Sequence, residues 1–164
     1  MSHQILTPQE IAHKIQRIAY QIFESNVDEK EIVVAGISGT GMEFALRISR
    51  VLEKITTAKI VLCEVQMDKK NPLKGVSTSI DKETFKHKSV VLVDDVLNSG
   101  STLIYGVHHF LQVPLKQLKT AVLVNRNHKK FPVKADFKGI SLSTSLQEHI
   151  EVVFGKGKEG VFLK

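Results

Sequence analysis

The chain of 164 residues contains a single cysteine, Cys63, so no disulfide bond can form within it. Cys63 lies in the apolar run 60–65, where a buried and unreactive thiol is expected. Such a thiol fits a reducing compartment, and the interpretation is a cytoplasmic protein. No stretch approaches the ~18 apolar residues that a membrane-spanning helix needs, so no membrane partner is expected. Residues 1–10 lack a basic region followed by an apolar run, which argues against a secretory signal.

Internal repeats and low-complexity segments are also absent, and the length predicts one domain over 1–164. The formal net charge of +6 favours anionic partners such as phosphorylated metabolites or RNA. The lysines are dispersed along the chain, so a solvated surface explains this charge better than a binding stripe does.

Apolar runs alternate with helical patterns along the chain. The first helix is expected at 7–24, where Thr7 is the N-cap, Pro8 follows and Glu10 closes a capping box. The periodicity predicts further helices at 42–54 and 100–111, strands at 32–35, 59–65, 89–93 and 120–124, and short edge strands at 150–154 and 161–163. This order predicts an α/β fold with a mostly parallel, twisted sheet flanked by helices.

Unusual loops follow these strands. Ligands of open parallel sheets bind beyond the carboxyl ends of the strands, so these loops are expected to gather at one edge. The polar segment 67–82, with Pro72 and Gly75, is expected to be a long mobile loop. It is either a lid that closes over a site or a plain surface hairpin.

The stretch VVLVDDVLNSGST, residues 90–102, carries the clearest functional signal. Gly100 permits close backbone approach, and the amides at a helix start point outward with the positive end of the helix dipole. The hydroxyl groups of Ser99, Ser101 and Thr102 add donors. This half of the stretch is a good cradle for a phosphate monoester.

The other half of the stretch is acidic. Asp94 and Asp95 would repel a phosphate that they faced, so they suit sugar hydroxyls or a divalent cation. A phosphorylated ribose satisfies both halves. The simpler explanation, a helix cap by Asp95 or Ser99, accounts for one polar residue but not for the cluster, so ligand binding is preferred.

The same stretch resembles the phosphoribosyl-pyrophosphate signature of type I phosphoribosyltransferases. Three more segments resemble the bifunctional pyrimidine-operon attenuator/uracil phosphoribosyltransferases, namely ILTPQEIAHKIQRIA, VVAGISGTG and AVLVNRNHKKFPVKADFKG. The resemblance implies the type I phosphoribosyltransferase fold with a small hood, and a homodimer or larger assembly. It also implies transfer of the phosphoribosyl group from phosphoribosyl pyrophosphate, with Mg²⁺, to a nitrogenous base such as uracil.

The resemblance also assigns roles to residues. Two carboxylates would hold the ribose hydroxyls, and the chain after them would bind the rest of the phosphoribosyl group: Asp94 and Asp95, then Val96, Leu97, Asn98, Ser99, Gly100, Ser101 and Thr102. The pyrophosphate loop would be Ser38, Gly39, Thr40 and Gly41. The base would contact Asn125, Arg126, Phe137 and Lys138, with the ring of Phe137 stacked on it.

Taken on residues alone, GISGTG at 36–41 is less specific. Met42 stands where a Walker loop needs lysine, and Phe44 stands where a dinucleotide fingerprint needs glycine or alanine. The spacing around Ser38 does not fit a nucleophile elbow. A backbone amide nest for a diphosphate and a bare tight turn both remain possible. Phe137, likewise, either stacks on a base or packs in the core.

Departures from the family pattern affect the expected activity. Purine-using relatives have an aspartate at the position of Asn98, and an amide cannot act as that general base. Asn98 therefore favours a pyrimidine, or a loss of catalysis. Ser38 and Thr40 replace a lysine and an arginine, VQMDKK replaces an arginine-containing segment, and Asn125 replaces an aspartate. Cations for the leaving group are missing unless the loop lysines substitute: Lys69, Lys70 and Lys74.

Two other functions stay open. One is a nucleotide-sensing regulator that binds RNA, and the other is a domain that binds only ribose 5-phosphate. His108 and His109 are expected on one helix, one buried and one exposed. The histidines do not share a metal-ligand spacing, so no metal site with direct side-chain ligands is assigned.

Overall fold

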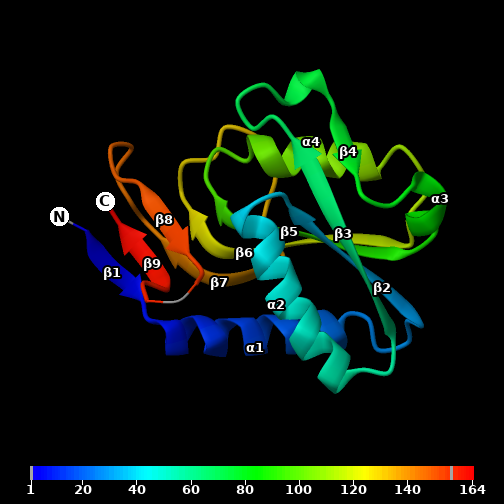
Figure 1. The fold of residues 1–164 in the computed structure, drawn as a ribbon. Helices are drawn as coiled ribbons and strands as arrows, with labels where there is room; N and C mark the ends of the chain where they lie inside the picture. Colours follow the sequence, from blue (N-terminus) through cyan, green and yellow to red (C-terminus); the bar gives the residue numbers. More distant parts are fainter. Residues whose placement is uncertain (1, 156) are drawn as a thin grey trace.

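The computed structural model describes residues 2–155 and 157–164, which form two sheets with helices around the larger one (Figure 1). The main sheet has the strand order β4-β3-β2-β5-β6-β7. Its strands are β2 (Glu31–Ile37), β3 (Lys59–Met67), β4 (Val76–Thr78), β5 (Ser89–Leu97), β6 (Gln117–Arg126) and β7 (Phe137–Leu142). All neighbouring strands are parallel except β3 and β4. The expected α/β fold with a mostly parallel sheet is confirmed.

Helices cover both faces of this sheet (Figure 1). One face carries α1 (Pro8–Glu24) and α2 (Thr40–Ile55), and the other carries α4 (Ser101–Phe110), with the short α3 (Lys82–Phe85) beside it. Val91 and Val93 of β5 pack in the core beneath α1 and α2, whereas Val90 and Leu92 pack in the core beneath α4. Because β5 is buried on both faces, its sequence is a continuous apolar run instead of an alternating one.

The first helix begins as its sequence predicts. Thr7 Oγ1 accepts a hydrogen bond from the amide of Glu10 at 3.2 Å, and the amide of Thr7 donates to Glu10 Oε2 at 2.8 Å. This capping box fixes the start of α1, and the buried isoleucine face of the helix packs against the sheet. None of the helices within 2–155 or 157–164 has the length and apolar character to cross a bilayer.

The smaller sheet is a hood formed by both ends of the chain. It has the order β1-β9-β8, made of β1 (His3–Leu6), β9 (Gly160–Leu163) and β8 (Ile150–Val153), all antiparallel. The expectation that 161–163 is an edge strand is wrong: β9 is central because β1 pairs with it. No local pattern marks β1, which is short and finds its partner at the other end of the chain.

Two further expectations are corrected. The segment 67–82 is not a loop throughout, because β3 continues to Met67 and β4 pairs with it, Val65 opposite Thr78 and Met67 opposite Val76. β4 has three residues, too few for an alternating pattern to be detected. In addition, the segment KADFKG leads into β7, an edge strand of the main sheet that the periodicity did not predict.

Candidate active site

Two helices begin at the carboxyl edge of the main sheet with glycine as the N-cap residue. Gly39, at the start of α2, has φ 92°, and Gly100, at the start of α4, has φ 89°. Both values lie in the left-handed region, which glycine adopts without strain. Neither N-cap residue provides a side-chain cap, and at α4 only the Ser101 amide is engaged nearby, by Ser99 Oγ at 3.2 Å, so other first-turn amides of both helices can serve an anionic ligand.

The two helix starts lie close together. A Cβ atom on Gly41 would come within 2.7 Å of Asp94 Oδ1 and 3.2 Å of its Cα. Helix α2 can therefore approach the end of β5 this closely only with glycine at position 41. The structure thus brings residues 38–41 beside Asp94, which joins the two glycine-rich loops in one site.

Asp94 is the most strongly perturbed carboxyl group at this edge. The residue is 3% exposed, and its Oδ1 accepts a hydrogen bond from the amide of Asp95 at 2.9 Å. Burial, followed by the charge of Asp95, raises the pKa of Asp94 well above its usual range. Lys69 Nζ lies 3.8 Å from Asp94 Oδ1 and opposes this shift. Without a further cation, the Asp94 carboxyl group therefore retains its proton more readily than an exposed aspartate does.

The chain from Asp94 to Leu103 wraps around a hollow of about 40 Å³. This volume suits a small group such as a phosphate and is too small for an aromatic ring. The segment after β6 supports the hollow from behind: the amides of Lys130 and Phe131 donate to the Ser99 carbonyl at 2.7 and 3.1 Å. Val133 closes the wall, since a Cβ on Gly100 would lie 2.6 Å from its Cγ1 atom. No local pattern in the sequence indicates that this segment supports the hollow.

The opposite side of the site, beside the first glycine loop, contains an acid. Ser38 Oγ donates to Glu64 Oε1 at 3.2 Å, and Gln66 Nε2 donates to the same oxygen at 3.1 Å. Of the three loop lysines expected to supply cations, Lys69 reaches Asp94, whereas Lys74 pairs with Asp68 at 3.4 Å. Lys69 is therefore the cation that the β3–β4 connection brings to the carboxylates.

Arg126 lies beside the hollow at the end of β6. Its Nη1 donates to Asn98 Oδ1 at 2.9 Å, and its Nε donates to Thr144 Oγ1 at 2.9 Å. The neighbouring Asn125 has a buried Oδ1 with no hydrogen-bond partner within the described residues. Asn125 and Arg126 thus lie at the same edge as the hollow, together with segment 144–148, which no pattern in the sequence indicates.

Phe137 and Lys138 are not at this edge. Parallel pairing places Phe137 opposite Ala121, in the middle of β6, whereas Ser141 and Leu142 are opposite Asn125 and Arg126. Phe137 packs against the core beneath α1 and α2, and Lys138 is exposed. Their expected base contacts are therefore corrected. In the register of β7 against β6, Phe137 and Lys138 lie near the start of β7, several residues before the carboxyl edge where Asn125 and Arg126 lie.

The donor set at this edge fits a magnesium ion brought by its ligand. Within 2–155 and 157–164 no group of three or more His, Cys, Asp or Glu side chains could hold a metal. Asp94 and Asp95 supply the two carboxylates. Mg²⁺ typically binds through one or two carboxylates together with waters and substrate phosphates, so no dedicated cage is required.

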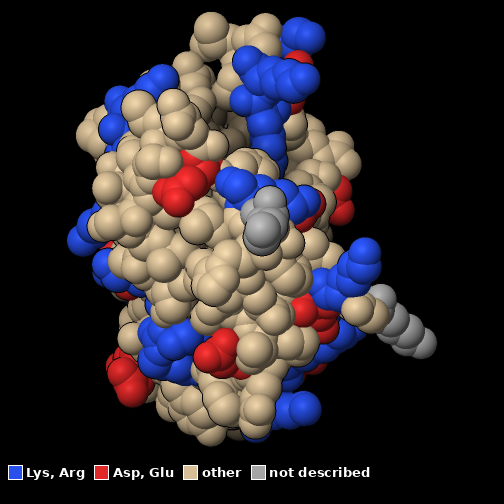
Figure 2. All heavy atoms as spheres, turned by 90° about the vertical axis from the view of Figure 1, so that its left-hand side faces the viewer, with Lys and Arg blue, Asp and Glu red and all other residues tan. Residues whose placement is uncertain are grey.

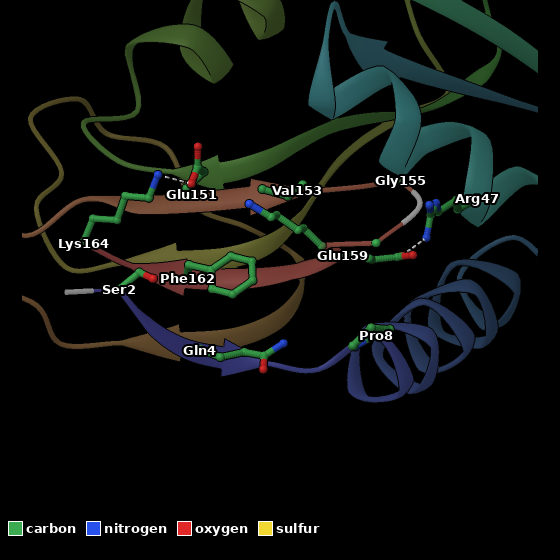
Figure 3. Close-up of a pocket in the computed structure, with 12 residues that line it drawn as sticks. Ser2, Gln4, Pro8, Arg47, Glu151, Val153, Gly155, Glu159, Phe162 and Lys164 are labelled. Carbon is green, nitrogen blue, oxygen red and sulfur yellow. Dashed lines mark hydrogen bonds and ion pairs between the residues drawn. The ribbon is translucent and has the colours of Figure 1, made fainter.

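A second cavity, of about 1030 Å³, lies between the hood and the side of α2 (Figure 3). Two of the cations that line it are ion-paired: Arg47 pairs with Glu43 and Glu159, and Lys164 pairs with Glu151. Lys158 lines the cavity as well. Arg47 also stacks over the ring of Phe154 at 4.4 Å. None of the residues that the sequence assigned to a site lines this cavity. The ion pair between Arg47 and Glu159 links α2 to the hood.

Comparison with known proteins identifies this architecture. Residues 1–155 match the family model described as the phosphoribosyl transferase domain. The chain belongs to the phosphoribosyltransferase family. The resemblance recognised in the sequence is thereby confirmed, because the match spans most of the chain.

Curated relatives of this phosphoribosyltransferase include proteins described as "Bifunctional protein PyrR". The protein from Fusobacterium nucleatum subsp. nucleatum is 34% identical, with 93% of this chain and 92% of the relative covered. The protein from Pediococcus pentosaceus is 31% identical with the same coverage of both chains. The relatives are thus matched over nearly their full length.

Solved structures show the same fold. A hypoxanthine-guanine phosphoribosyltransferase from Bacillus anthracis superposes with a TM-score of 0.75 at 22% identity, covering 90% of this chain and 84% of that chain. A hypoxanthine phosphoribosyltransferase from Trypanosoma cruzi, in complex with the product IMP, gives a TM-score of 0.71 at 18% identity, with 87% and 81% covered. At these identities the comparison establishes the type I phosphoribosyltransferase fold and no more.

Proposed function

We propose that this protein transfers a phosphoribosyl group from phosphoribosyl pyrophosphate to a pyrimidine base such as uracil. In this reaction the bond from ribose C1 to the pyrophosphate oxygen breaks and a bond from C1 to a ring nitrogen forms. Pyrophosphate leaves, and the proton of that nitrogen passes to solvent. The observation that carries the proposal is the convergence of two uncapped helix starts on a buried aspartate beside a phosphate-sized hollow.

Each part of the site has a role in this proposal. The hollow formed by 98–102 binds the 5′-phosphate, Asp94 and Asp95 bind the ribose hydroxyls, and the amides of 39–41 bind the diphosphate, since the Ser38 amide already donates to the Val65 carbonyl at 2.8 Å. Mg²⁺ would supply positive charge to the departing pyrophosphate. This contribution is important here because Ser38 already donates to an acid, Glu64, where the family pattern has cations.

The β3–β4 connection is positioned to exclude water. A mobile cover suits a reaction in which water would otherwise hydrolyse the sugar donor. Residues 68–75 carry Lys69 to within 3.8 Å of Asp94. In the proposal this segment closes over the bound donor, and Lys69 replaces part of the missing positive charge. The cytoplasm, where an unpaired buried thiol such as Cys63 stays reduced, is the proposed compartment, and a homo-oligomer is the proposed assembly.

The first test is calorimetric titration with phosphoribosyl pyrophosphate, with and without Mg²⁺, on wild type and on Asp95→Asn. We expect binding that Mg²⁺ tightens and that the variant loses. Release of pyrophosphate on adding uracil would then establish transfer. Binding of ribose 5-phosphate with no preference for the pyrophosphorylated sugar would instead identify a domain that binds phosphorylated ribose alone. No binding of either sugar by wild type would contradict the proposal.

RNA binding is the second candidate, because the relatives are described as bifunctional and the net charge is +6. Figure 2 shows the hood side, where Lys and Arg form several separate groups with acidic side chains between them. This face thus has no continuous basic surface, and the lysines are also dispersed along the sequence, so RNA binding ranks below transfer. An affinity for RNA that falls steeply with salt concentration would support it.

A further inference from the structure

His109 is buried where helix α4 meets strand β4 (Figure 1). The residue is 8% exposed, and its ring packs against Phe85 and Phe110, with centroid distances of 6.3 and 5.7 Å. On the β4 side, its Nε2 lies 3.5 Å from Thr78 Oγ1. The hydroxyl hydrogen of Thr78 is already donated to the Ile80 carbonyl at 2.7 Å, so Thr78 offers the ring only a lone pair. A neutral imidazole with its proton on Nε2 satisfies this contact.

A cavity of about 690 Å³ lies beside this ring, between β4 and α4. One wall comes from α4, and the other comes from β4 and the short 3-10 helix η1 (Pro72–Lys74). In the described part of the sheet, β4 is an edge strand of three residues that pairs only with β3. A strand this short, with a cavity behind it, opens at low cost. The cavity also gives water a route to the ring when β4 moves outward.

A protonated His109 would have no acidic partner in this environment. Four other titratable side chains line the cavity: Tyr105, His108, Asp81 and Lys82. The carboxylate of Asp81 already accepts hydrogen bonds from the amide and the hydroxyl group of Thr84, at 2.9 and 2.8 Å. Burial, followed by the charges of Lys82 and His108, lowers the pKa of His109 from its ordinary value. The imidazolium form is therefore destabilised while β4 stays against α4.

We infer that His109 is a pH-sensitive latch: its neutral ring holds β4 against α4, and protonation of the ring releases the strand. The proton comes from solvent, and an imidazolium must be hydrated or paired, which the outward movement of β4 allows. An opened strand leaves the ring near the pKa of a solvated histidine, about 6.5. The free energy that favours the closed form is therefore fully present above this value, and it is lost as the pH falls toward the lowered pKa of the closed form.

The latch controls the connection that carries Lys69. Residues 68–75 are held by β3 at one end and by β4 at the other, and this arrangement places Lys69 Nζ 3.8 Å from Asp94 Oδ1. Release of β4 frees one end of the connection and withdraws Lys69 from the carboxylates. Under the proposed function, acidic pH thus weakens donor binding through His109, which lines no part of the phosphate hollow. The latch itself does not depend on that function.

The test is amide hydrogen exchange, followed by mass spectrometry on the ligand-free protein at pH 5.5, 6.5 and 7.5. Observed rates divided by the intrinsic rates at each pH give protection factors, which report local opening. Segment 76–80 reports on β4, and segment 90–93 in β5 reports on the core. The variant His109→Gln cannot be protonated and keeps a side-chain N–H donor. The matched control is His108→Gln, at the exposed histidine that precedes it on the same helix.

We expect the protection of 76–80 in wild type and in His108→Gln to fall about tenfold between pH 7.5 and pH 5.5, while 90–93 stays protected. His109→Gln should change less than about twofold over this range, because it has no proton to gain. Lys82→Gln removes a positive charge beside the ring and should move the release to higher pH. This variant tests the latch even if His109→Gln does not fold.

Three results would overturn the inference. Protection of 76–80 that is independent of pH in wild type would show that no latch operates. An equal fall in wild type and in His109→Gln, or a release in Lys82→Gln at unchanged pH, would assign the pH dependence to another group. A parallel fall in 90–93 would show that the whole fold loosens instead of the strand. None of these results bears on the proposed function, since the measurement contains no ligand.

Discussion

At the scale of single residues, burial of the Asp94 carboxyl group lowers the stability of the folded chain at neutral pH. Its pKa is raised mainly by burial and then by Asp95, so the folded chain holds a proton there more tightly than the unfolded chain does. The unfolded chain loses that proton first as the pH rises. Stability attributable to Asp94 is therefore highest below the ordinary pKa of an aspartate, falls as the pH rises toward the raised pKa, and stays low above it.

We predict that Asp94→Asn raises the thermal midpoint at pH 8 and leaves it nearly unchanged at pH 4, while it abolishes sugar binding. The amide keeps an oxygen for the amide of Asp95 and removes the buried charge. Differential scanning calorimetry between pH 4 and pH 8 measures the effect. Asp81 is the contrasting control, because hydrogen bonds from Thr84 lower its pKa, so its contribution is lost as the pH falls. A lower midpoint for Asp94→Asn at pH 8 would show that the buried charge is fully compensated.

At the scale of elements, the connection between β3 and β4 supplies the one lysine that contacts Asp94 within the described residues. We predict that Lys69→Ala weakens binding of phosphoribosyl pyrophosphate about tenfold, which corresponds to ~1.4 kcal/mol, and changes ribose 5-phosphate binding less than twofold. The reason is that only the pyrophosphorylated sugar extends its charge toward this connection. Calorimetric titration gives both affinities. Lys74→Ala, whose lysine pairs with Asp68, should change neither, and equal losses in both lysine variants would indicate general charge attraction.

The parts of the site that lie within one continuous segment of the chain could be predicted from the sequence, and those that depend on contacts between distant segments could not. The β5 strand, its acidic end and the start of α4 are contiguous, so local pattern and composition located them. The bond between Arg126 and Asn98 joins residues 28 apart, and the support of Ser99 by Lys130 and Phe131 depends on how the chain returns after β6. No local periodicity encodes such contacts. The same limit explains Phe137, whose position depends on the pairing of β7 with β6 and not on its motif.

At the scale of the whole molecule, the hood and the main sheet share one core. Leu6, Val152 and Val161 of the hood pack in the same cluster as Ile11 and Ile15 of α1. We predict that Val161→Ala destabilises the entire fold by about 2 kcal/mol, since it leaves a cavity in this shared cluster. Unfolding should remain a single transition, with the same midpoint by far-ultraviolet circular dichroism and by calorimetry.

The control for this prediction is Leu146→Ala, at a leucine that is 81% exposed, where we expect a change below about 0.5 kcal/mol. A separate low-temperature transition in Val161→Ala would show that the hood unfolds independently of the main sheet. That result would also imply that the segment 144–148, which contacts Arg126, can open while the phosphate-binding loop stays folded.

The pairing of β1 with β9 has a consequence for the order of events during biosynthesis. His3 lies opposite Leu163, and Gln4 lies opposite Phe162. β1 therefore has no partner until β9 has been translated, although β2, β5 and α4, which lie between them in the chain, have already been made. The phosphate cradle can form on the nascent chain, whereas the hood is completed only after translation passes its last strand. The hollow between β5 and α4 can therefore form on the nascent chain before the hood sheet is complete.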